Sequence, residues 1–437
     1  MHIVLLSGGS GKRLWPLSNE VRSKQFIKFF KKEDGSYESM VQRVHRQIRK
    51  VDPNATITIA TSKTQVSAIH NQLGKDVGIS VEPCRRDTFP AIALATAYMH
   101  DVQNVGEKEA VVVCPVDPFV DDAYFSMLEK VGKQAEKGES NLLLLGIEPT
   151  YPSEKYGYII PSDGNSVSKV STFKEKPDAA TAETYISSGA LWNAGVFAFR
   201  LGYLLETAHR LIDFTDYHDL FAKYETLNKI SFDYAVVEKE SEIQVMRYEG
   251  IWKDLGTWNT LSESMSEPIV GLGEMDESCT DVHIINELDI PILAMGLHDV
   301  IICASAEGVL VSDKERSSQI KQYVESFKQP IMFAEKSWGS FRILDVGKES
   351  LTIKAILQAG GQMHYHSHRQ RDEVWTVIGG KGIVVMDGER RAVNASDVIS
   401  IKRGVKHTII AETELTLIEV QHGKAITVED KETFPSP

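Results

Sequence analysis

The first residues whose types suggest chemistry form a glycine-rich turn near the start of the chain. A short apolar run, His2–Ser7, leads directly into the sequence Gly8-Gly9-Ser10-Gly11-Lys12-Arg13. The three glycines let the backbone turn sharply and point several N–H groups at one place, which suits a phosphate group. Positive charge follows at Lys12, Arg13, Arg22 and Lys24. The segment therefore predicts a site for a phosphorylated ligand.

This turn differs from the two commonest phosphate-binding loops. A P-loop needs Gly-x4-Gly-Lys-[Ser/Thr], but Arg13 stands where the hydroxyl that binds Mg²⁺ should be. A Rossmann Gly-x-Gly-x-x-Gly fingerprint would start at Gly9 and Gly11, but Leu14 replaces its last glycine. The turn alone is equally compatible with an ordinary β–α connection, so its interpretation depends on the residues downstream.

A second chemical pattern lies near the end of the chain and suggests a metal site. His366 and His368 are separated by one residue, so they project to the same side of a strand. Glu373 and His407 can complete a site for a divalent metal ion. Gln362 and His364 offer an alternative ligand pair a few positions earlier.

Composition excludes several classes of protein. The net charge of −13, from 48 Lys and Arg against 61 Asp and Glu, argues against a nucleic-acid binder. Residues 1–50 nevertheless hold 11 Lys and Arg against 4 Asp and Glu, so an anionic ligand is expected there. The four cysteines are widely separated, which favours a reducing compartment. No apolar run approaches the ~20 residues of a membrane span, so we expect a cytoplasmic protein without a membrane partner.

The pattern of apolar runs divides the chain into an α/β part and a β-rich part. Up to about residue 262, strand-like runs such as Ala110–Pro115 and Leu142–Ile147 alternate with helical patterns such as Ala91–Val102. This alternation predicts a doubly wound, mainly parallel sheet that binds ligands at the carboxyl ends of its strands. Short β-type runs separated by turn residues follow. We expect a connecting segment over 263–328, a small barrel or jelly roll over 329–437, and a frayed tail, Glu429–Pro437.

Eight blocks in order along the first 260 residues resemble the sugar-nucleotide pyrophosphorylases, in particular the mannose-1-phosphate guanylyltransferases. The first is the glycine turn through Leu17 with Lys24-Gln25-Phe26, followed by Glu82-Pro83 with Arg86-Asp87-Thr88. The others are Cys114–Asp117, Gly146-Ile147 through Tyr156–Ile159, Phe173–Pro177, Trp192–Phe197, Ser231–Tyr234 and Trp252–Trp258. The resemblance implies a Rossmann-like nucleotidyltransferase domain over 1–262 that forms a GDP-sugar, most simply GDP-mannose, and pyrophosphate from GTP and a sugar 1-phosphate.

The resemblance also implies roles for particular residues. Asp117 and Asp254 would share a Mg²⁺ ion, Arg13 and Lys24 would hold the triphosphate, and Lys176 would meet the sugar phosphate. Glu175 and Asn193 would bind sugar hydroxyls. The remaining residues expected around the nucleotide and sugar are Gly8, Gly9, Gly11, Glu82, Arg86, Asp87, Thr88, Tyr156 and Gly157.

Three positions depart from the family pattern and leave alternatives open. Asp87, Phe89 and Pro118 stand where the family usually has Asn, Ala and His. The alternatives are a related transferase for another sugar 1-phosphate or base, and a regulatory protein that binds sugar nucleotides without catalysis.

The β-rich C-terminal part resembles the cupins. The spacing Gly360-x5-His366-x-His368-x4-Glu373-x6-Gly380, with Gly404-x2-His407, fits the two cupin motifs. Lys336-Ser337-Trp338-Gly339 is similar to the opening block of the type II mannose-6-phosphate isomerase half of bifunctional enzymes. The resemblance implies a cupin β-barrel that holds Zn, Mn, Fe or Co, an isomerase activity as a second function, and a homodimer. The alternative is a cupin that serves packing or dimerisation alone.

Overall fold

The computed structural model describes residues 1–9, 12–19, 21–327, 329–424 and 426–436. The chain divides into two compact units. The first comprises Met1–Ser10, Lys24–Val66 and Leu73–Ser266, and the second comprises Gly11–Ser23, Ser67–Gln72 and Glu267–Pro437. The three-part division expected from the sequence stays a prediction.

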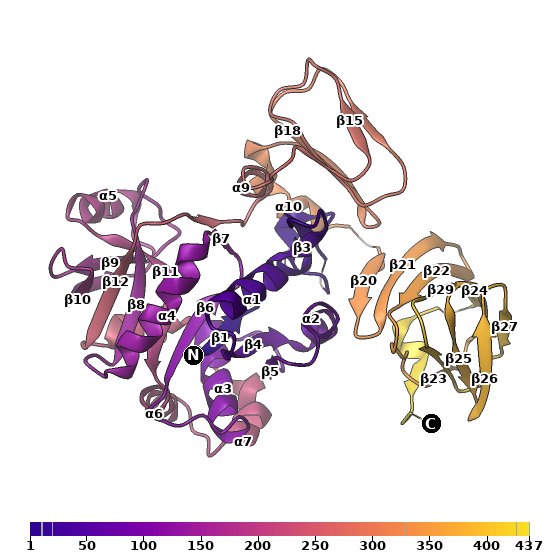
Figure 1. Cartoon of the computed structure of the whole chain (residues 1–437), viewed down its shortest axis with the longest axis horizontal. Helices are drawn as coiled ribbons and strands as arrows, with labels where there is room; N and C mark the ends of the chain where they lie inside the picture. The colour runs from indigo at the N-terminus through magenta and orange to yellow at the C-terminus, as the bar shows by residue number, and fades with distance from the viewer. Residues whose placement is uncertain (10–11, 20, 328, 425, 437) are drawn as a thin grey trace. The chain divides into compact units, whose positions relative to one another are not determined.

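A nine-stranded mixed sheet forms the centre of the first unit (Figure 1). In spatial order its strands are β5 (Gly78–Glu82), β4 (Thr56–Ser62), β1 (His2–Leu6), β6 (Ala110–Pro115), β11 (Leu191–Arg200), β8 (Leu142–Ile147), β12 (Ile243–Tyr248), β10 (Val167–Lys174) and β9 (Tyr158–Pro161). The four strands from β5 to β6 are parallel, but β11 runs antiparallel to both β6 and β8. The sheet is therefore mixed, whereas the sequence pattern predicted a mainly parallel one.

Helices cover both faces of this sheet, which explains why its central strands are apolar throughout. One face carries α3 (Thr88–Asp101), α6 (Leu201–Leu211), α7 (Tyr217–Lys223) and α8 (Phe232–Ala235), and the other carries α1 (Met40–Val51) and α4 (Asp122–Glu136). In β6, Val111 and Val113 join the core beneath α3, while Val112 approaches Gly132 of α4. Strands buried on both faces are typical of α/β folds.

The remaining elements of this part of the chain are short. They are the hairpin β2 (Lys28–Lys31) and β3 (Tyr37–Ser39), the pair β7 (Pro118–Val120) and β13 (Trp252–Asp254), the helices α2 (Val66–Leu73), α5 (Ala179–Ser187) and α9 (Trp258–Ser262), and the 3-10 turns η1 (Lys12–Leu14), η2 (Lys24–Phe26), η3 (Lys63–Gln65), η4 (Tyr224–Thr226) and η5 (Val237–Lys239).

One edge of the sheet gathers the segments expected to bind ligands. The carboxyl ends of β1, β4, β5 and β6 meet at this edge because these strands are parallel. Since β11 is antiparallel, its beginning reaches the same edge, where Asn193 lies opposite Gly146 of β8. Ligands of open α/β sheets bind at such edges.

The second unit begins with a short stack of parallel strands. Successive passes of the chain add β14 (Ile269–Val270), β16 (His283–Asn286) and β18 (Val300–Ser305) to one sheet, and β15 (Gly273–Met275) and β17 (Ile292–Ala294) to another. β19 (Gly308–Asp313) returns antiparallel to β18, and η6 (Glu315–Gln319) and α10 (Lys321–Val324) follow. Val282, Ile284, Ala294 and Ile302 form the core of this segment.

Two antiparallel sheets then pack face to face as a cupin, as the sequence predicted (Figure 1). One sheet has the order β20 (Phe333–Lys336), β21 (Gly339–Val346), β22 (Ser350–Leu357), β29 (Leu415–Gly423), β24 (Arg371–Gly379) and β27 (Val398–Ile401). The other has β26 (Glu389–Asn394), β25 (Lys381–Met386), β28 (His407–Ala411), β23 (His366–His368) and β30 (Lys431–Thr433). Their inner faces meet around the fully buried Trp375.

The first part of the C-terminal tail forms regular structure, so the expectation of a frayed end over Glu429–Pro437 was wrong for residues 429–433. A 3-10 turn, η7 (Val428–Asp430), leads into β30, which pairs with β23. Asp430 is buried, and its carboxylate accepts hydrogen bonds from the backbone N–H groups of Arg369 and Gln370 at 3.0 and 3.1 Å. A polar sequence can hold such a position because its polar groups find partners.

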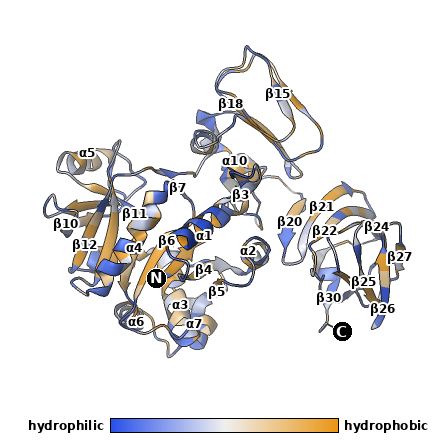
Figure 2. Cartoon of the chain, in the orientation of Figure 1, coloured by the Kyte–Doolittle hydropathy of each residue, from blue (hydrophilic) through white to orange (hydrophobic). Residues whose placement is uncertain are grey.

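Hydropathy follows this architecture. Figure 2 shows apolar residues along the central strands of the α/β sheet and polar residues on the outer faces of α1 and α4. Among the residues that the structure describes, no helix is long and apolar enough to cross a membrane.

Candidate functional site

The glycine turn lines one side of a pocket of about 420 Å³ at the carboxyl ends of β1, β5 and β6. Four other residues that the sequence placed at the site also line this pocket: Glu82, Asp87, Thr88 and Asp117. Arg85 and Lys229, which the sequence analysis did not name, line it as well. Gly9 has φ +134°, which favours glycine at that position. The Arg85 guanidinium donates to the Gly9 carbonyl at 3.0 Å, so a cation lies beside the turn.

Glu82 is the most buried carboxylate in this pocket. Its side chain accepts a hydrogen bond from the Tyr224 hydroxyl at 2.8 Å. Burial raises the pKa of Glu82 above its usual range, although the Tyr224 hydrogen bond and the charge of Arg85 oppose the shift. A carboxyl group in this setting can pair with N–H donors of a nucleobase.

Asp87 and Phe89 occupy different environments at the start of α3. Asp87 has φ +71°, caps the helix and lines the pocket. With ψ at −176°, this backbone conformation is one that residues with a side chain rarely adopt, so the backbone is strained at Asp87. Phe89 is 3% exposed and packs in the hydrophobic core instead.

Two carboxylates from distant parts of the chain meet beside Lys24. Asp117 lies between β6 and β7, Asp254 ends β13, and the pairing of β7 with β13 places Asp254 opposite Pro118. The Lys24 ammonium is 2.8 Å from Asp117 Oδ2 and 3.6 Å from Asp254 Oδ1. Burial acts to lower the pKa of Lys24, but the two carboxylates outweigh burial and raise the pKa above its usual value. The ammonium therefore stays charged.

Gln25 explains how Lys24 is held in place. The Gln25 side chain is buried and donates to the carbonyl and hydroxyl oxygens of Ser7, both at 3.1 Å. Ser7 directly follows β1 and immediately precedes the glycine turn. Lys24 is therefore tied to the turn through its neighbour.

A second pocket of about 220 Å³ adjoins this cluster and shares Asp117 with the first pocket. Its predicted lining residues are Asp117, Tyr156, Gly157, Glu175, Asn193 and Asp254. A Cβ atom at Gly157 would fall 2.5 Å from Glu175 Oε2, so a larger residue there would displace this carboxylate. The Tyr156 ring packs against Trp192 and Trp252, with ring centroids 4.9 and 5.5 Å apart, and forms an aromatic wall.

Asp233 is a residue of this second pocket that the sequence analysis did not single out as a site residue. It accepts a hydrogen bond from the Asn193 amide at 2.7 Å. Burial and the neighbouring charge of Glu175 raise the pKa of Asp233 to about 7. The resemblance block Ser231–Tyr234 contained the signal, but nothing local distinguished Asp233 from a surface aspartate.

Four other predicted residues lie in different settings. Arg13 is exposed in η1 and belongs to the second unit, while Gly11 lies outside the described residues. The Arg86 guanidinium donates to the Glu225 carbonyl. Lys176 has φ +44° and pairs with Glu175 at 2.5 Å. The roles expected for these four residues stay predictions.

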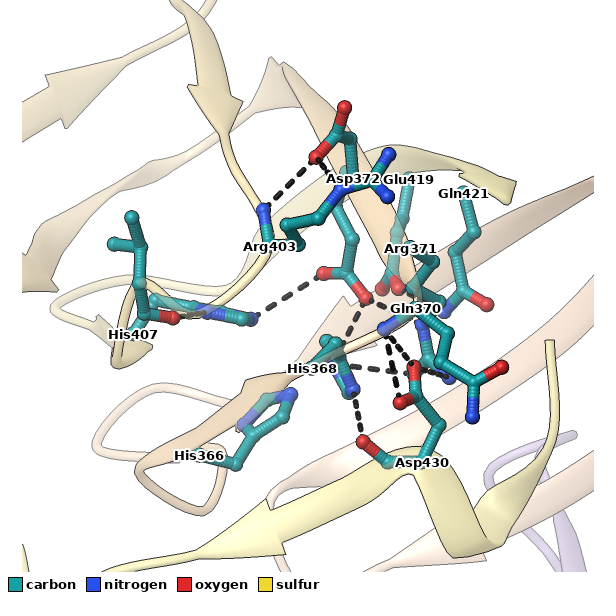
Figure 3. A network of polar contacts seen from close by, with 12 residues as sticks. His366, His368, Gln370, Arg371, Asp372, Arg403, His407, Glu419, Gln421 and Asp430 are labelled. Carbon is teal, nitrogen blue, oxygen red and sulfur yellow. Dashed lines mark hydrogen bonds and ion pairs between the residues drawn. The ribbon is translucent and has the colours of Figure 1, made fainter. Parts of the chain in front are cut away.

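The cupin brings its four predicted ligands together. The ligand atoms of His366, His368, Glu373 and His407 all lie within 4.8 Å of one another, and all four residues are buried. In Figure 3 the three imidazole rings turn toward one another, and their centroids are 4.3 to 5.4 Å apart. His364, the alternative ligand, is exposed and lies outside this group.

Backbone carbonyls orient each imidazole in the same way. The Nδ1 atoms of His366 and His407 face the His364 and Val405 carbonyls at 2.6 and 2.9 Å. The His368 Nδ1 atom faces the Asp430 carbonyl at 3.3 Å. A carbonyl only accepts, so Nδ1 carries a proton in each ring, and Nε2 is the nitrogen that would bind a metal in place of any proton it carries.

Glu373 is the acidic partner in the same cluster. Burial alone would raise its pKa, but hydrogen bonds from His368 and His407 hold the pKa of Glu373 well below its usual range. Burial also lowers the pKa of His366 to about 2. Imidazole nitrogens and an ionised carboxylate are ligands that divalent metals accept, so the donor set fits a metal ion.

The chain thus has two separate centres with different chemistry. In the first, a glycine turn, a charged lysine and two carboxylates stand between two pockets, an arrangement that suits reactions of phosphorylated substrates. In the second, three imidazoles and a carboxylate converge inside a β sandwich.

The first centre and its fold define a nucleotidyl transferase. Residues 2–268 match the model of the nucleotidyl transferase family, and residues 354–420 match that of the cupin domain. The chain belongs to the nucleotidyl transferase family and carries a C-terminal cupin domain, as the sequence predicted.

Relatives share this whole architecture. The xanthan biosynthesis protein XanB of Xanthomonas campestris pv. campestris (strain B100) is 30% identical over 98% of this chain and 96% of the relative. A mannose-1-phosphate guanylyltransferase of Escherichia coli (strain K12) is 28% identical over 99% of this chain and 98% of its own length. A crystal structure from Thermus thermophilus, described as a mannose-1-phosphate geranyltransferase, matches with a TM-score of 0.61 and 28% identity over 74% of this chain and 98% of that one.

Replacing two of the imidazoles tests the cupin centre. We expect His366→Ala combined with His368→Ala to abolish metal retained by the cupin, because half of the ligands are lost. Elemental analysis of the purified full-length protein after exhaustive dialysis measures the metal. His364→Ala is the matched control and should retain the metal content of the unaltered protein. Equal metal in the double variant and the unaltered protein would exclude this site.

Proposed function

We propose that the first centre transfers the guanylyl group of GTP to mannose 1-phosphate and so forms GDP-mannose and pyrophosphate. The observation that carries the proposal is the cluster of Lys24, Asp117 and Asp254. Asp117 lines both pockets, so the cluster lies where the two pockets adjoin. The glycine turn suits phosphates in one pocket, and polar groups suit sugar hydroxyls in the other. The name of the E. coli relative supports the choice of base and sugar.

The proposed reaction joins two anions, so charge neutralisation and positioning dominate its catalysis. An oxygen of the sugar phosphate attacks the α-phosphorus of the triphosphate, and the bond to the β-phosphate breaks to release pyrophosphate. Lys24 keeps its charge through its two carboxylate neighbours. In this proposal Lys24 and Arg13 hold the triphosphate, and Lys176 holds the sugar phosphate.

A Mg²⁺ ion fits the two carboxylates of this centre. Asp117 and Asp254 offer hard oxygen ligands, and both lie within 4 Å of the same ammonium group. Bound Mg²⁺ would neutralise charge on the reacting phosphates. Mg²⁺ commonly takes one or two protein carboxylates and leaves its other positions to phosphates and water.

The pockets suggest how the two substrates are recognised. Glu82, buried and hydrogen-bonded to Tyr224, would accept from the base, while Asp87 and Thr88 lie beside it. Glu175, Asn193 and Asp233 would exchange hydrogen bonds with sugar hydroxyls. Because Phe89 packs in the core, its bulk leaves the pocket of the base free for a purine.

Assays with several substrates test the proposed function and its alternatives. Each of the four nucleoside triphosphates is incubated with mannose, glucose and heptose 1-phosphates and Mg²⁺, and released pyrophosphate is measured. We expect GTP with mannose 1-phosphate to give the highest kcat/KM. A different best pair would indicate a related transferase. Binding of sugar nucleotides without turnover of any pair would indicate a regulatory protein.

Removing one negative charge at a time tests the carboxylate pair. We expect Asp117→Asn and Asp254→Asn each to lower kcat at least ~10²-fold, because each removes a group that faces the phosphates. Steady-state kinetics in Mg²⁺ measures the effect, and unchanged thermal unfolding shows that the fold is retained. Asp76→Asn, at an exposed position outside both pockets, is the control. Turnover close to that of the control would remove either aspartate from the proposed metal site.

A second candidate function, sugar-phosphate isomerisation, concerns the cupin. The observation that favours it is the set of three imidazoles and an ionised Glu373 around one point. A divalent Zn, Mn, Fe or Co ion fits these ligands. Such an ion can polarise a carbonyl group and so assist proton transfer between neighbouring carbons. We therefore include mannose-6-phosphate isomerase activity in the proposal.

The same histidine variants separate the two activities. The variant with His366→Ala and His368→Ala should lose interconversion of mannose 6-phosphate and fructose 6-phosphate but keep nucleotide-sugar synthesis within about two-fold, since the centres share no catalytic group. Coupled spectrophotometric assays measure both reactions. A folded, metal-free variant that loses about ten-fold or more of its transferase turnover would contradict independence of the centres.

The proposed reaction carries expectations about assembly and context. We expect a cytoplasmic homodimer, since nucleoside triphosphates and sugar phosphates are cytoplasmic metabolites. The printed name of XanB, a xanthan biosynthesis protein, supports a place in polysaccharide biosynthesis.

A further inference from the structure

The segment between the glycine turn and Lys24 is anchored by the connecting strands of the second unit. Arg22 is buried, and its two terminal nitrogens donate to the two carboxylate oxygens of Glu287, both at 2.8 Å. The guanidinium also lies 4.8 Å from the centroid of the Phe333 ring. Glu287 directly follows β16, so this ion pair joins residues 265 positions apart.

Asn19 makes a second anchor three residues earlier. Its side-chain oxygen accepts from the backbone N–H groups of Val21 and Arg22 at 2.9 and 2.7 Å. Its amide nitrogen donates to Glu307 at 2.8 Å, and the same Glu307 oxygen also accepts from the Met332 and Phe333 N–H groups. Glu307 therefore links the segment to the start of the cupin.

Trp15 and Pro16 provide a third anchor. The Ser305 hydroxyl donates to the Pro16 carbonyl at 2.6 Å. The Trp15 ring lies edge-on to Phe327, with centroids 5.3 Å apart, and close enough to Gly308 that a Cβ atom there would fall 2.5 Å from the ring. All three anchors come from residues before 24 and after 286.

These contacts decide what the positive charge of Arg22 does. The sequence suggested that Arg22 adds to the positive charge around the phosphates. In the structure, both terminal nitrogens of its guanidinium donate to Glu287 instead. Burial lowers the pKa of Arg22, and the paired Glu287 more than compensates, so the guanidinium stays charged. Removing one partner of a buried bidentate pair leaves the other charge unpaired, which is costly.

The anchored segment is continuous in the chain with residues of the proposed transferase centre on both sides. Gly8 and Gly9 line the first pocket, and Lys24 pairs with Asp117. We infer that Arg22 and Glu287, supported by Asn19 and Glu307, are positioning residues for nucleotide binding: they fix the backbone that joins the glycine turn to Lys24. This inference rests on the proposed transferase function and extends it to residues beyond position 260.

The decisive experiment uses Glu287→Gln in the full chain with two measurements. Hydrogen exchange followed by mass spectrometry should show faster exchange of residues 12–23. The KM for GTP should rise about ten-fold with a smaller change in kcat, because a displaced backbone weakens binding of the nucleotide. Asp281→Asn is the matched control, since it breaks the Asp281–Lys314 ion pair of the same connecting segment and leaves the three anchors intact.

A charge exchange separates positioning from direct contact with phosphate. Arg22→Glu and Glu287→Arg should each raise the KM for GTP, and the double variant should restore exchange protection and most of the affinity. If Arg22 bound phosphate itself, a glutamate at position 22 would keep the double variant weak. That result, or a Glu287→Gln variant that matches the Asp281→Asn control in both measurements, overturns the inference.

Two further outcomes are also decisive. If Glu287→Gln does not fold, Asn19→Ala makes a smaller break in the same anchor and should change both measurements in the same direction. If no pair of substrates is turned over by the unaltered protein, the proposed function fails. Exchange of residues 12–23 then still decides whether Glu287 fixes the segment.

Discussion

The transferase centre depends on one electrostatic balance, that of Lys24 between Asp117 and Asp254. Two carboxylates brought close together repel each other, and a buried ammonium alone would tend to lose its proton. Between the two carboxylates, the Lys24 ammonium keeps its charge. Lys24, Asp117 and Asp254 come from three different segments of the chain. The pairing of β7 with β13 and the hydrogen bonds between Gln25 and Ser7 are therefore both needed to bring the three charges together.

The cupin also holds several ionisable side chains close together. Its three imidazoles are buried close together, where protonated rings would repel one another, and backbone carbonyls give all three the same proton arrangement. The Asp430 carbonyl belongs to η7 in the C-terminal tail, so the tail helps to orient one of the four candidate ligands (Figure 3). Two centres in one chain can thus hold different metals, because one offers oxygen ligands and the other mainly nitrogen.

Much of the fold was predictable because local patterns report burial. The apolar runs located the strands, and the His-x-His spacing placed two ligands on one side of β23. The direction of β11 was not predictable, since a run buried on both faces reads the same in either direction. Fraying was predicted for the polar tail Glu429–Pro437 because the partners of its Asp430 carboxylate, Arg369 and Gln370, are about 60 residues away in sequence.

For the site, the sequence by itself determined the chemical groups and their local spacing: the glycine turn, the lysine after it, the separate aspartates and the cupin ligands. Only the tertiary structure decided which of these groups meet. In the structure, Lys24 pairs with both aspartates, and Asp233 and Arg85 join the lining of the pockets. Arg22 forms its ion pair with Glu287. The physical reason is that an ion pair depends on distance in space, and distances between remote segments follow from strand order and packing, which no short stretch of sequence encodes.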